Sequence, residues 1–226
     1  GSDTYPPRTY IYFTPDYPNG KNGWYVSNVR VTFWAYDNSC VYATYCRING
    51  GEWKTYHDWP AVFVISEDGE HMIEFYSIDN VGNKEDIKTS YRNIDKTPPE
   101  TSLEWEVFKE DWKWHIRFIL NATDETSGMD NWVEFYINDA LQDEFEVLHW
   151  PFEFIIPWCR VFKTVTFKFV VHDMAGNSAI ELVNGSDIKS YSSSQSSSTQ
   201  QTQNIWFLRW FDRFPLLSRL LGWFIW

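Results

Sequence analysis

Two short segments place carboxylate and amide side chains at a spacing that suits metal binding. Asp79 and Asn83 enclose one Gly-containing turn, and Asp173 and Asn177 enclose another. Calcium takes about 6–8 oxygen ligands, largely from Asp, Asn and backbone carbonyl groups. These four residues are therefore candidate calcium ligands, and calcium is the one cofactor for which the sequence offers any ligands.

Two further aspartates lie where they could complete these groups of ligands. Sheet pairing could bring Asp37 to the first turn and Asp124 to the second, which would add a carboxylate to each. The alternative is a tight turn, in which Asp and Asn close local hydrogen bonds and Gly supplies a positive φ. The spacing favours the tight turn and leaves the calcium site open.

Catalytic chemistry has little support. The five histidines are spread over separate segments, namely His57, His71, His115, His149 and His172. No nucleophile elbow, zinc-protease helix or phosphate-binding loop is present. The paired carboxylates Glu104/Glu106 and Glu144/Glu146 fit a solvated strand face. We therefore expect no catalytic residues and a protein that is not an enzyme.

The three cysteines, Cys40, Cys46 and Cys159, do not form a metal-binding pattern. If Cys40 and Cys46 lie on one extended strand, they are about 20 Å apart, which is too far for a disulfide. A bridge would need Cys40 in a loop that folds back, or Cys159 as the partner. The simpler prediction is that Cys46 is a small core residue and the other two are free thiols.

An internal repeat organises the first part of the chain. Five blocks recur in the same order, each roughly 90 residues after its first copy. The pairs are Pro6-Pro7 with Pro98-Pro99, Asp37 with Asp124, Ile48-Asn49 with Ile137-Asn138, Trp59-Pro60 with Trp150-Pro151, and Gly82-Asn83 with Gly176-Asn177. Two copies of one domain are therefore predicted, over residues 4–95 and 96–189. In this alignment Cys46 matches Phe135, and Trp59 and Trp150 are expected to pack at matching edges.

Each copy has the pattern of short antiparallel strands. Apolar residues alternate with polar ones along 29–36, 114–122, 71–79 and 167–171, and Asn-Gly and Asp-Gly turns separate such segments. About six or seven strands in roughly 90 residues is typical of an immunoglobulin-like β-sandwich. The predicted fold class is all-β, with two tandem sandwiches.

Three segments resemble a known family. Residues 68–83 read DGEHMIEFYSIDNVGN, residues 45–53 read YCRINGGEW, and residues 94–99 read IDKTPP. They resemble the Ig-like repeats of bacterial and archaeal cell-surface proteins that are often labelled OmpL47-type. The resemblance covers nearly all of the first copy and implies an architectural, extracellular module without a reaction of its own. Cys40 and Cys46 stand where the resemblance leads us to expect Gly and Tyr.

Composition narrows the class of partner. The 226 residues carry a net charge of −12, and aromatic residues make up 19%, with 14 Trp. An acidic surface repels phosphate, so nucleic acid is not an expected partner. No apolar run is long enough for an ordinary membrane-spanning helix. Two sequons, at Asn121 and Asn184, are glycosylation candidates compatible with export.

The composition changes after Lys189. Residues 190–203 form a spacer rich in Ser, Gln and Thr, and residues 204–226 form a hydrophobic segment that is expected to be helical and that Pro215 interrupts. Its large apolar residues are the predicted assembly or anchoring contacts: Trp206, Phe207, Trp210, Phe211, Phe214, Leu216, Leu217, Leu220, Leu221, Trp223, Phe224 and Trp226. Burial of each such side chain stabilises by ~1.5–3 kcal/mol, so the segment needs a covering surface.

Three coverings are open: other copies of the chain, a membrane interface, or a docking partner for secretion. Self-assembly ranks first, so we expect a homo-oligomeric, extracellular structural protein of a cell-surface layer or filament. The alternatives are a membrane-tethered Ig-like protein and a surface adhesion or carbohydrate-binding accessory module. In the last case exposed Trp side chains, with Trp105, Trp112 and Trp114 as candidates, would stack on a glycan.

Overall fold

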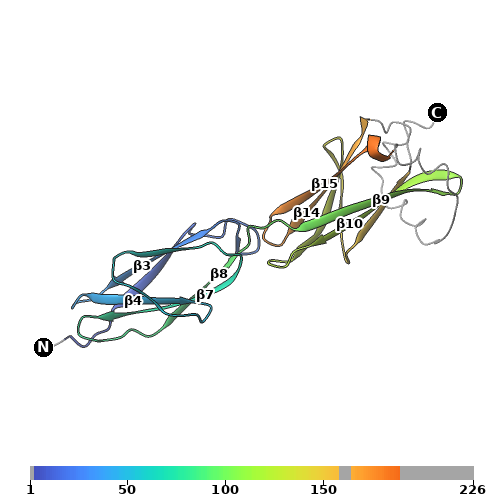
Figure 1. Cartoon of the computed structure of the whole chain (residues 1–226). Helices are drawn as coiled ribbons and strands as arrows, with labels where there is room; N and C mark the ends of the chain where they lie inside the picture. The colour runs from blue at the N-terminus through green and yellow to red at the C-terminus, as the bar shows by residue number, and fades with distance from the viewer. Residues whose placement is uncertain (1–2, 158–163, 189–226) are drawn as a thin grey trace. The chain divides into compact units, whose positions relative to one another are not determined.

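The computed structural model describes residues 3–157 and 164–188 (Figure 1). The described chain is nearly all β, with strands β1 to β15 and one short helical turn at 185–188. No helix in this part is long and apolar enough to cross a membrane. The spacer 190–203, the hydrophobic segment 204–226 and Cys159 lie outside the described residues.

Contacts divide the chain into two compact units. The first comprises Gly1–Pro99 together with Thr123–Asp130 and His172–Ser178. The second comprises Glu100–Ala122, Asn131–Val171 and Ala179–Trp226. Two loops of the second sequence copy are therefore packed with the first unit. Lys21 N–H donates to the Ala175 carbonyl at 2.7 Å, and the Asn22 amide donates to the Met174 carbonyl at 2.9 Å.

The first sandwich consists of two sheets. The smaller has the order β1-β3-β6, formed by β1 (Arg8–Thr14), β3 (Val29–Tyr36) and β6 (Ala61–Ile65). The larger has the order β2-β8-β7-β4-β5, formed by β2 (Trp24–Tyr25), β8 (Lys88–Ile94), β7 (Gly69–Asp79), β4 (Val41–Ile48) and β5 (Lys54–Tyr56). All its neighbouring strands are antiparallel except the short β2–β8 pair.

The second sandwich repeats this topology. One sheet has the order β13-β10-β9, formed by β13 (Phe152–Pro157), β10 (Lys113–Thr123) and β9 (Glu100–Glu110). The other has the order β12-β11-β14-β15, formed by β12 (Ala140–Glu146), β11 (Met129–Ile137), β14 (Thr166–Asp173) and β15 (Ser178–Asn184). Each strand of the second sandwich has a counterpart in the first, and only β2 of the first sandwich has none in the second. This crossed strand order in two facing sheets is that of an immunoglobulin-like sandwich.

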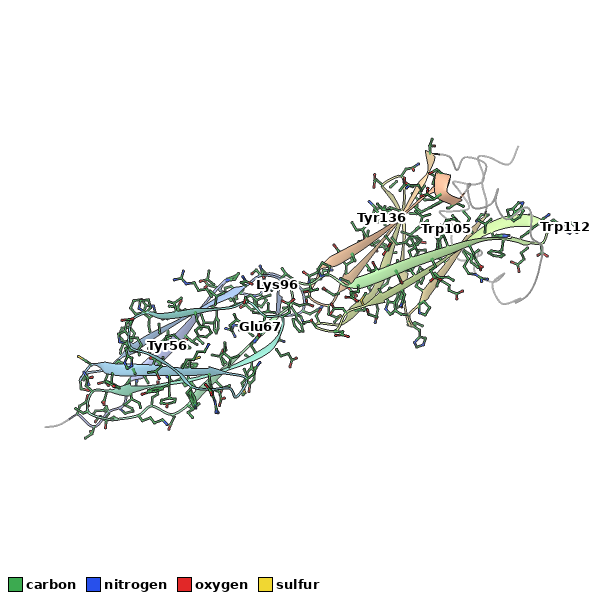
Figure 2. The ribbon with its side chains drawn as sticks, viewed as in Figure 1. Tyr56, Glu67, Lys96, Trp105, Trp112 and Tyr136 are labelled. Atoms are coloured by element: carbon green, nitrogen blue, oxygen red, sulfur yellow. The ribbon has the colours of Figure 1, made fainter. Side chains whose placement is uncertain are left out.

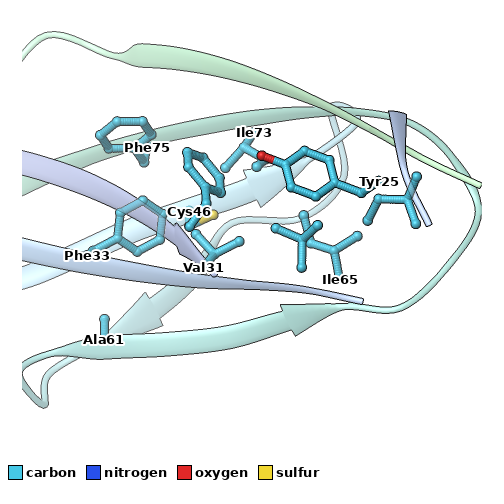
Figure 3. Close-up of a cluster of buried hydrophobic side chains, with 11 residues drawn as sticks. Tyr25, Val31, Phe33, Cys46, Ala61, Ile65, Ile73 and Phe75 are labelled. Atoms are coloured by element: carbon cyan, nitrogen blue, oxygen red, sulfur yellow. The ribbon is translucent and has the colours of Figure 1, made fainter. Parts of the chain in front are cut away.

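The core of the first sandwich forms where the predicted alternation places it (Figure 3). Val29, Val31 and Phe33 on β3 are fully buried and face Ile73 and Phe75 on β7. Cys46 lies among them, free and buried, which confirms the prediction for that residue. Burial raises the pKa of its thiol to about 12, so it stays protonated and acts as a small apolar side chain.

A matched pair of asparagines, one in each sandwich, fixes the register between the strand before it and the strand that it contacts. Asn49 has a φ of 52°, and its backbone N–H and side-chain oxygen pair with the carbonyl and N–H of Met72. Asn138 has a φ of 49° and makes the same two bonds with Thr166. Asn tolerates this left-handed backbone better than most residues, which explains why Ile-Asn recurs in both copies.

A buried polar network lies under β1 in the first sandwich. The Glu85 carboxylate accepts hydrogen bonds from the Thr9 N–H at 2.9 Å, the Thr9 hydroxyl at 2.6 Å and the Ser77 N–H at 3.1 Å. Lys88 forms an ion pair with the same carboxylate. Because a buried carboxylate is costly unless its oxygens are paired, this set of contacts fixes β1 against β7.

The structure corrects one detail of the expected strand pattern. The alternation along 114–122 predicts that Trp114 shares a buried face with Ile116, Phe118, Leu120 and Ala122, but Trp114 is half exposed while the other four are buried. It follows a two-residue turn at Asp111 and Trp112, both with positive φ, at the start of β10. Trp114 is the second residue of β10, close to this turn, and its side chain is presented to solvent rather than to the core.

Cys40 occupies a backbone position that favours glycine. Its φ is 75°, it is exposed, and its thiol is free. A side chain in this region is disfavoured by roughly 1 kcal/mol or more, which glycine avoids. We expect Cys40→Gly to raise the free energy of unfolding by about 0.5–1 kcal/mol in urea titration. Cys40→Ser, which keeps the Cβ, should give no gain, and an equal gain from Ser would show that the thiol rather than the backbone matters.

Candidate functional site

Three carboxylates converge at each of two places in the chain. Asp3, Asp37 and Asp79 form the first Asp triad, and Asp95, Asp124 and Asp173 form the second. In each triad, one oxygen from every residue lies within 4.8 Å of the others. Asp79, Asp95 and Asp173 are almost completely buried. The sequence candidates Asp79 and Asp173 are thus brought together with the Asp37 and Asp124 that sheet pairing was expected to supply.

The turns that hold Asp79 and Asp173 are built in the same way. Asp79 Oδ1 accepts the backbone N–H groups of Val81 at 2.9 Å and Asn83 at 2.8 Å. Asp173 Oδ1 accepts those of Gly176 at 2.6 Å and Asn177 at 2.8 Å. These are the local hydrogen bonds of the tight-turn interpretation, with Gly82 and Gly176 at a φ of 97°. The turn therefore forms, and it also orients each carboxylate toward its triad.

Asn83 and Asn177 position the triads as hydrogen-bond donors. The Asn83 amide donates to Asp79 Oδ2 at 2.7 Å and to the carbonyl of Asp3 at 3.1 Å. The Asn177 amide donates to Asp173 Oδ2 at 2.8 Å and to the carbonyl of Asp95 at 3.0 Å. Each asparagine thus connects its turn to the segment that directly precedes a repeated Pro-Pro pair.

The third carboxylate of each triad comes from the loop after the second strand of the smaller sheet. Asp37 Oδ1 accepts the N–H and hydroxyl of Ser39 at 2.8 and 2.7 Å. Asp124 Oδ1 accepts the N–H groups of Thr126, Ser127 and Gly128 at 3.1, 2.8 and 2.8 Å. In both residues these hydrogen bonds go to Oδ1, so Oδ2 is the oxygen available to a ligand.

The environment shifts the pKa values of Asp95 and Asp79 in opposite directions. Burial raises the pKa of Asp95, and the charges of Asp124 and Asp173 raise it further, against smaller lowering by hydrogen bonds from Ser127 and Thr97. Burial also acts to raise the pKa of Asp79, but hydrogen bonds from Asn83, Val81 and Gly82 together outweigh it and leave the pKa lowered. The charges that raise the pKa of Asp95 are those of the two other acids of its triad, and a cation bound among them would favour the ionised form.

The donor set fits calcium. Each triad supplies three hard carboxylate oxygens, which Ca²⁺ prefers over nitrogen or sulfur ligands. Asp3 Oδ2 is buried without any hydrogen-bond partner, whereas Asp3 Oδ1 accepts the N–H of Tyr5 at 3.0 Å. A buried carboxylate oxygen left unpaired is costly unless something binds it. Oxygens from three residues leave further coordination positions for water or carbonyl groups.

Sequence reasoning missed Asp3 and Asp95. Both precede the repeated Pro-Pro pair by three positions, in Asp3-Thr4-Tyr5-Pro6 and Asp95-Lys96-Thr97-Pro98. Both also cap the same local turn, since Asp95 Oδ1 accepts the N–H of Thr97 at 3.1 Å as Asp3 does for Tyr5. The signal was therefore present in the aligned blocks, although only the fold shows that these residues meet the other two.

The three candidate glycan-stacking Trp residues do not form one surface. Trp112 is 90% exposed at the end of the β9–β10 hairpin (Figure 2). Trp114 is half exposed, and Lys109 Nζ lies 5.2 Å from the ring centroid of Trp112 and 5.9 Å from that of Trp114. Trp105 is partly buried on the inward side of β9. Only the hairpin pair is presented to a ligand.

The other predicted sites lie apart from the triads. Asn121 is exposed on β10, and Asn184 is exposed at the end of β15, where its side chain contacts Thr166 and Asp187. His57 and His71 each contact a backbone carbonyl, of Tyr42 and Glu67 respectively. Within residues 3–157 and 164–188, the groups able to hold a metal ion contain only aspartates.

Comparison with known proteins gives structural similarity alone. No protein-family model matches the chain, and no curated protein matches it. Among solved structures, it is similar to fibronectin(III)-like modules of Clostridium thermocellum CbhA, with 11% identity, a TM-score of 0.37, and 77% of this chain and 92% of that chain covered.

Two further structures show comparable similarity. The D00-D0 domain of intimin has 9% identity and a TM-score of 0.34, over 77% of this chain and 98% of that one. A 1.5-MDa bacterial ice-binding adhesin, described for host cell surface retention, has 14% identity and a TM-score of 0.35, over 80% of this chain and 64% of that one. The fold class, an all-β chain of two immunoglobulin-like sandwiches, rests on the strand order of this chain.

Proposed function

We propose that the chain is a non-catalytic, extracellular structural protein that assembles into a cell-surface layer or filament. Two sandwiches of the same strand order serve as architectural modules, and residues 204–226 supply a cohesive contact between copies. The observation that carries this proposal is the repeated sandwich with its repeated Asp triad. The resemblance of residues 45–53, 68–83 and 94–99 to OmpL47-type surface repeats supports the extracellular setting.

The hydrophobic segment supplies the argument for assembly. It contains four Trp and four Phe residues among 23 and therefore needs a covering surface. In the sequence, the spacer 190–203, which is Ser, Gln and Thr apart from Tyr191, separates this segment from the second sandwich. Other copies of the same chain are present wherever the protein is exported, so they can always cover this segment.

Removal of the segment is expected to abolish assembly. The full chain should elute from size-exclusion chromatography as an oligomer, and a chain ending at Lys189 should elute as a monomer with an unchanged circular dichroism spectrum. Replacement of Trp206, Trp210 and Trp223 by Ser in the full chain should have the same effect without changing the length. Equal monomer elution of all three proteins would contradict the proposal, and flotation of the full chain with liposomes would favour a membrane-tethered role.

We further propose that each Asp triad binds Ca²⁺ and thereby fixes the segment before each Pro-Pro pair to the two turns that supply the other carboxylates. Asp3, Asp37 and Asp79 come from three separate segments of the chain, and so do Asp95, Asp124 and Asp173. A cation that bridges three segments stabilises the folded state only, because the unfolded chain does not hold them together.

The exposed hairpin supports a second candidate function, that of an adhesion or carbohydrate-binding accessory module. Trp112 and Trp114 present aromatic faces to solvent at the end of β9 and β10. Such rings can stack on sugar rings. Retention on a glycan array that is lost when both are changed to Ala, while the size-exclusion profile is unchanged, would favour this function over assembly.

A further inference from the structure

One sheet face of the first sandwich carries a cluster of aromatic side chains that the fold does not require. Tyr10 and Tyr12 on β1 and Trp34 and Tyr36 on β3 point away from the core and are 39–59% exposed. Tyr10 pairs directly with Trp34 across the two strands, and the rings of Tyr10 and Tyr36 lie 6.1 Å apart. We call these four residues, with Arg8 and Arg30 on the same face, the aromatic face.

The second sandwich shows that the sheet can form without aromatic residues at these four positions. Phe33 on β3 pairs with Ala61, which is two residues after Trp59. Leu120 on β10 pairs with Phe152, which is two residues after the matching Trp150. Phe33 therefore aligns with Leu120, and β3 with β10. The repeated Pro-Pro pair aligns β1 with β9 in the same way. In that alignment the four aromatic positions are taken by Ser102, Glu104, Asn121 and Thr123. The same sheet therefore forms with small polar and acidic residues at these positions.

The corresponding face of the second sandwich is acidic. Its outward positions on β9 carry Glu100, Ser102, Glu104 and Glu106. Arg117 on β10 is bonded to Glu106 at 2.7 Å and lies 3.9 Å from the carboxylate of Glu153 on β13. Glu100 and Glu104 therefore leave excess negative charge on this surface, which we call the acidic face.

The aromatic face has the opposite charge. Its charged outward residues on β1, β3 and β6 are Arg8 and Arg30, although the whole chain has a net charge of −12. Tyr, Trp and Arg without Lys, Asp or Glu is the composition enriched at the centre of protein–protein interfaces and among their hot spots. Opposite charge on the two faces would orient one against the other and exclude pairing of two acidic faces.

We infer that the aromatic face of one copy binds the acidic face of a second copy of this chain. The inference rests on the proposed assembly and names a contact for it in addition to residues 204–226. Because the two faces differ, the contact is heterologous, and it leaves a free aromatic face and a free acidic face on every pair. Such a contact adds copies in one direction and suits a filament or layer.

The internal repeat supplies the substitutions for a test. Tyr10→Ser and Trp34→Asn install the residues that the second sandwich carries at the same positions, so folding should be retained. Sedimentation velocity of the full chain over a concentration series should show that the double variant self-associates at least about tenfold more weakly. Tyr91→Ser, which alters a Tyr that is even more exposed (65%) on β8 in the opposite sheet, should leave association unchanged.

Charge reversal tests the identity of the partner. Arg8→Glu with Arg30→Glu should weaken association of the full chain by at least about tenfold. Glu100→Arg with Glu104→Arg should weaken it similarly, and all four changes in one chain should restore it. Restoration requires that the two faces meet, and a merely destabilised sandwich would not show it. Unfolding temperatures measured in parallel should stay within a few degrees of the wild type.

The outcomes separate this inference from the proposed function. A full chain that stays monomeric at every concentration would overturn both. Assembly that is lost without residues 204–226 but unaffected by the Tyr10/Trp34 and Arg8/Arg30 variants would leave the proposed function standing and overturn the contact between faces. Failure of the four-residue reversal to restore association would also overturn it. So would aromatic-face variants that lose only polysaccharide or liposome binding.

Discussion

Calcium is expected to raise the unfolding temperature of the full chain by about 5–20 °C. Extracellular calcium modules have dissociation constants of about 10⁻⁴–10⁻³ M. At about 10 mM calcium, each such site stabilises the folded state by roughly 1.4–2.7 kcal/mol. For a sandwich of this size, about 1 kcal/mol corresponds to about 4–8 °C. Differential scanning fluorimetry in calcium and in chelator measures the shift, and magnesium at matched ionic strength should give a much smaller one.

The calcium effect should depend on pH in a defined direction. The raised pKa of Asp95 means that its contribution to stability is present below the unfolded pKa of about 3.9 and is lost as pH rises through the folded pKa. Asp79, with its lowered pKa, has the opposite sign, and its contribution is lost as pH falls through the folded pKa. Calcium needs the ionised carboxylates, so its effect should be largest above about pH 5 and absent near pH 3.

Asp124→Asn separates metal binding from turn formation. Asn keeps an oxygen that can accept the N–H groups of Thr126, Ser127 and Gly128, but it removes one charge from the second triad. In chelator this variant should be at least as stable as the wild type, because repulsion with Asp95 and Asp173 is relieved. In calcium it should gain less. Asp58→Asn, at an exposed position outside the triads, serves as the control, and an unchanged calcium shift in Asp124→Asn would exclude the second site.

The repeat made most of the fold predictable from sequence. Alternation along 29–36 and 71–79 identified the buried residues of β3 and β7, because both strands pack one face on the core and leave the other to solvent. The match of Cys46 to Phe135 predicted that both residues lie in a core, and both are buried. Repetition helps because two copies must satisfy the same packing, so shared positions indicate structural demands.

The functional surfaces were harder to predict from the sequence, because positions shared by the two copies reflect packing and not function. Asp3 and Asp95 contribute to the triads through contacts with residues far along the chain, which alternation does not indicate. The aromatic face is invisible to a search for shared positions, because it consists of the positions at which the two copies differ. A polar or aromatic residue on an outward strand position satisfies the sheet equally well, so only the register of β1 and β3 shows that Tyr10, Trp34 and Tyr36 lie together.

Phe135→Ala is expected to be the most destabilising single change in the second sandwich. Phe135 is fully buried on β11, and its ring centroid lies 4.8 Å from Phe154, 5.1 Å from Phe169 and 6.2 Å from Phe167. Truncation removes a large apolar side chain and leaves a cavity that these rings cannot fill, at a cost of about 3–5 kcal/mol. That is a large share of the ~5–15 kcal/mol by which a typical protein is stable, so a measurable fraction of the molecules should have the second sandwich unfolded near room temperature.

The first sandwich provides the matched control for this loss. Cys46 occupies the equivalent buried position, but Cys46→Ala removes only one sulfur atom and should cost about 1 kcal/mol. Phe135→Leu should retain most of the stability, because it preserves the apolar contacts at nearly the same volume. Urea titrations followed by Trp fluorescence give the free energies of unfolding. Equal losses for Phe135→Ala and Cys46→Ala would contradict the packing of Phe154, Phe167 and Phe169 around the Phe135 ring as the source of stability in the second core.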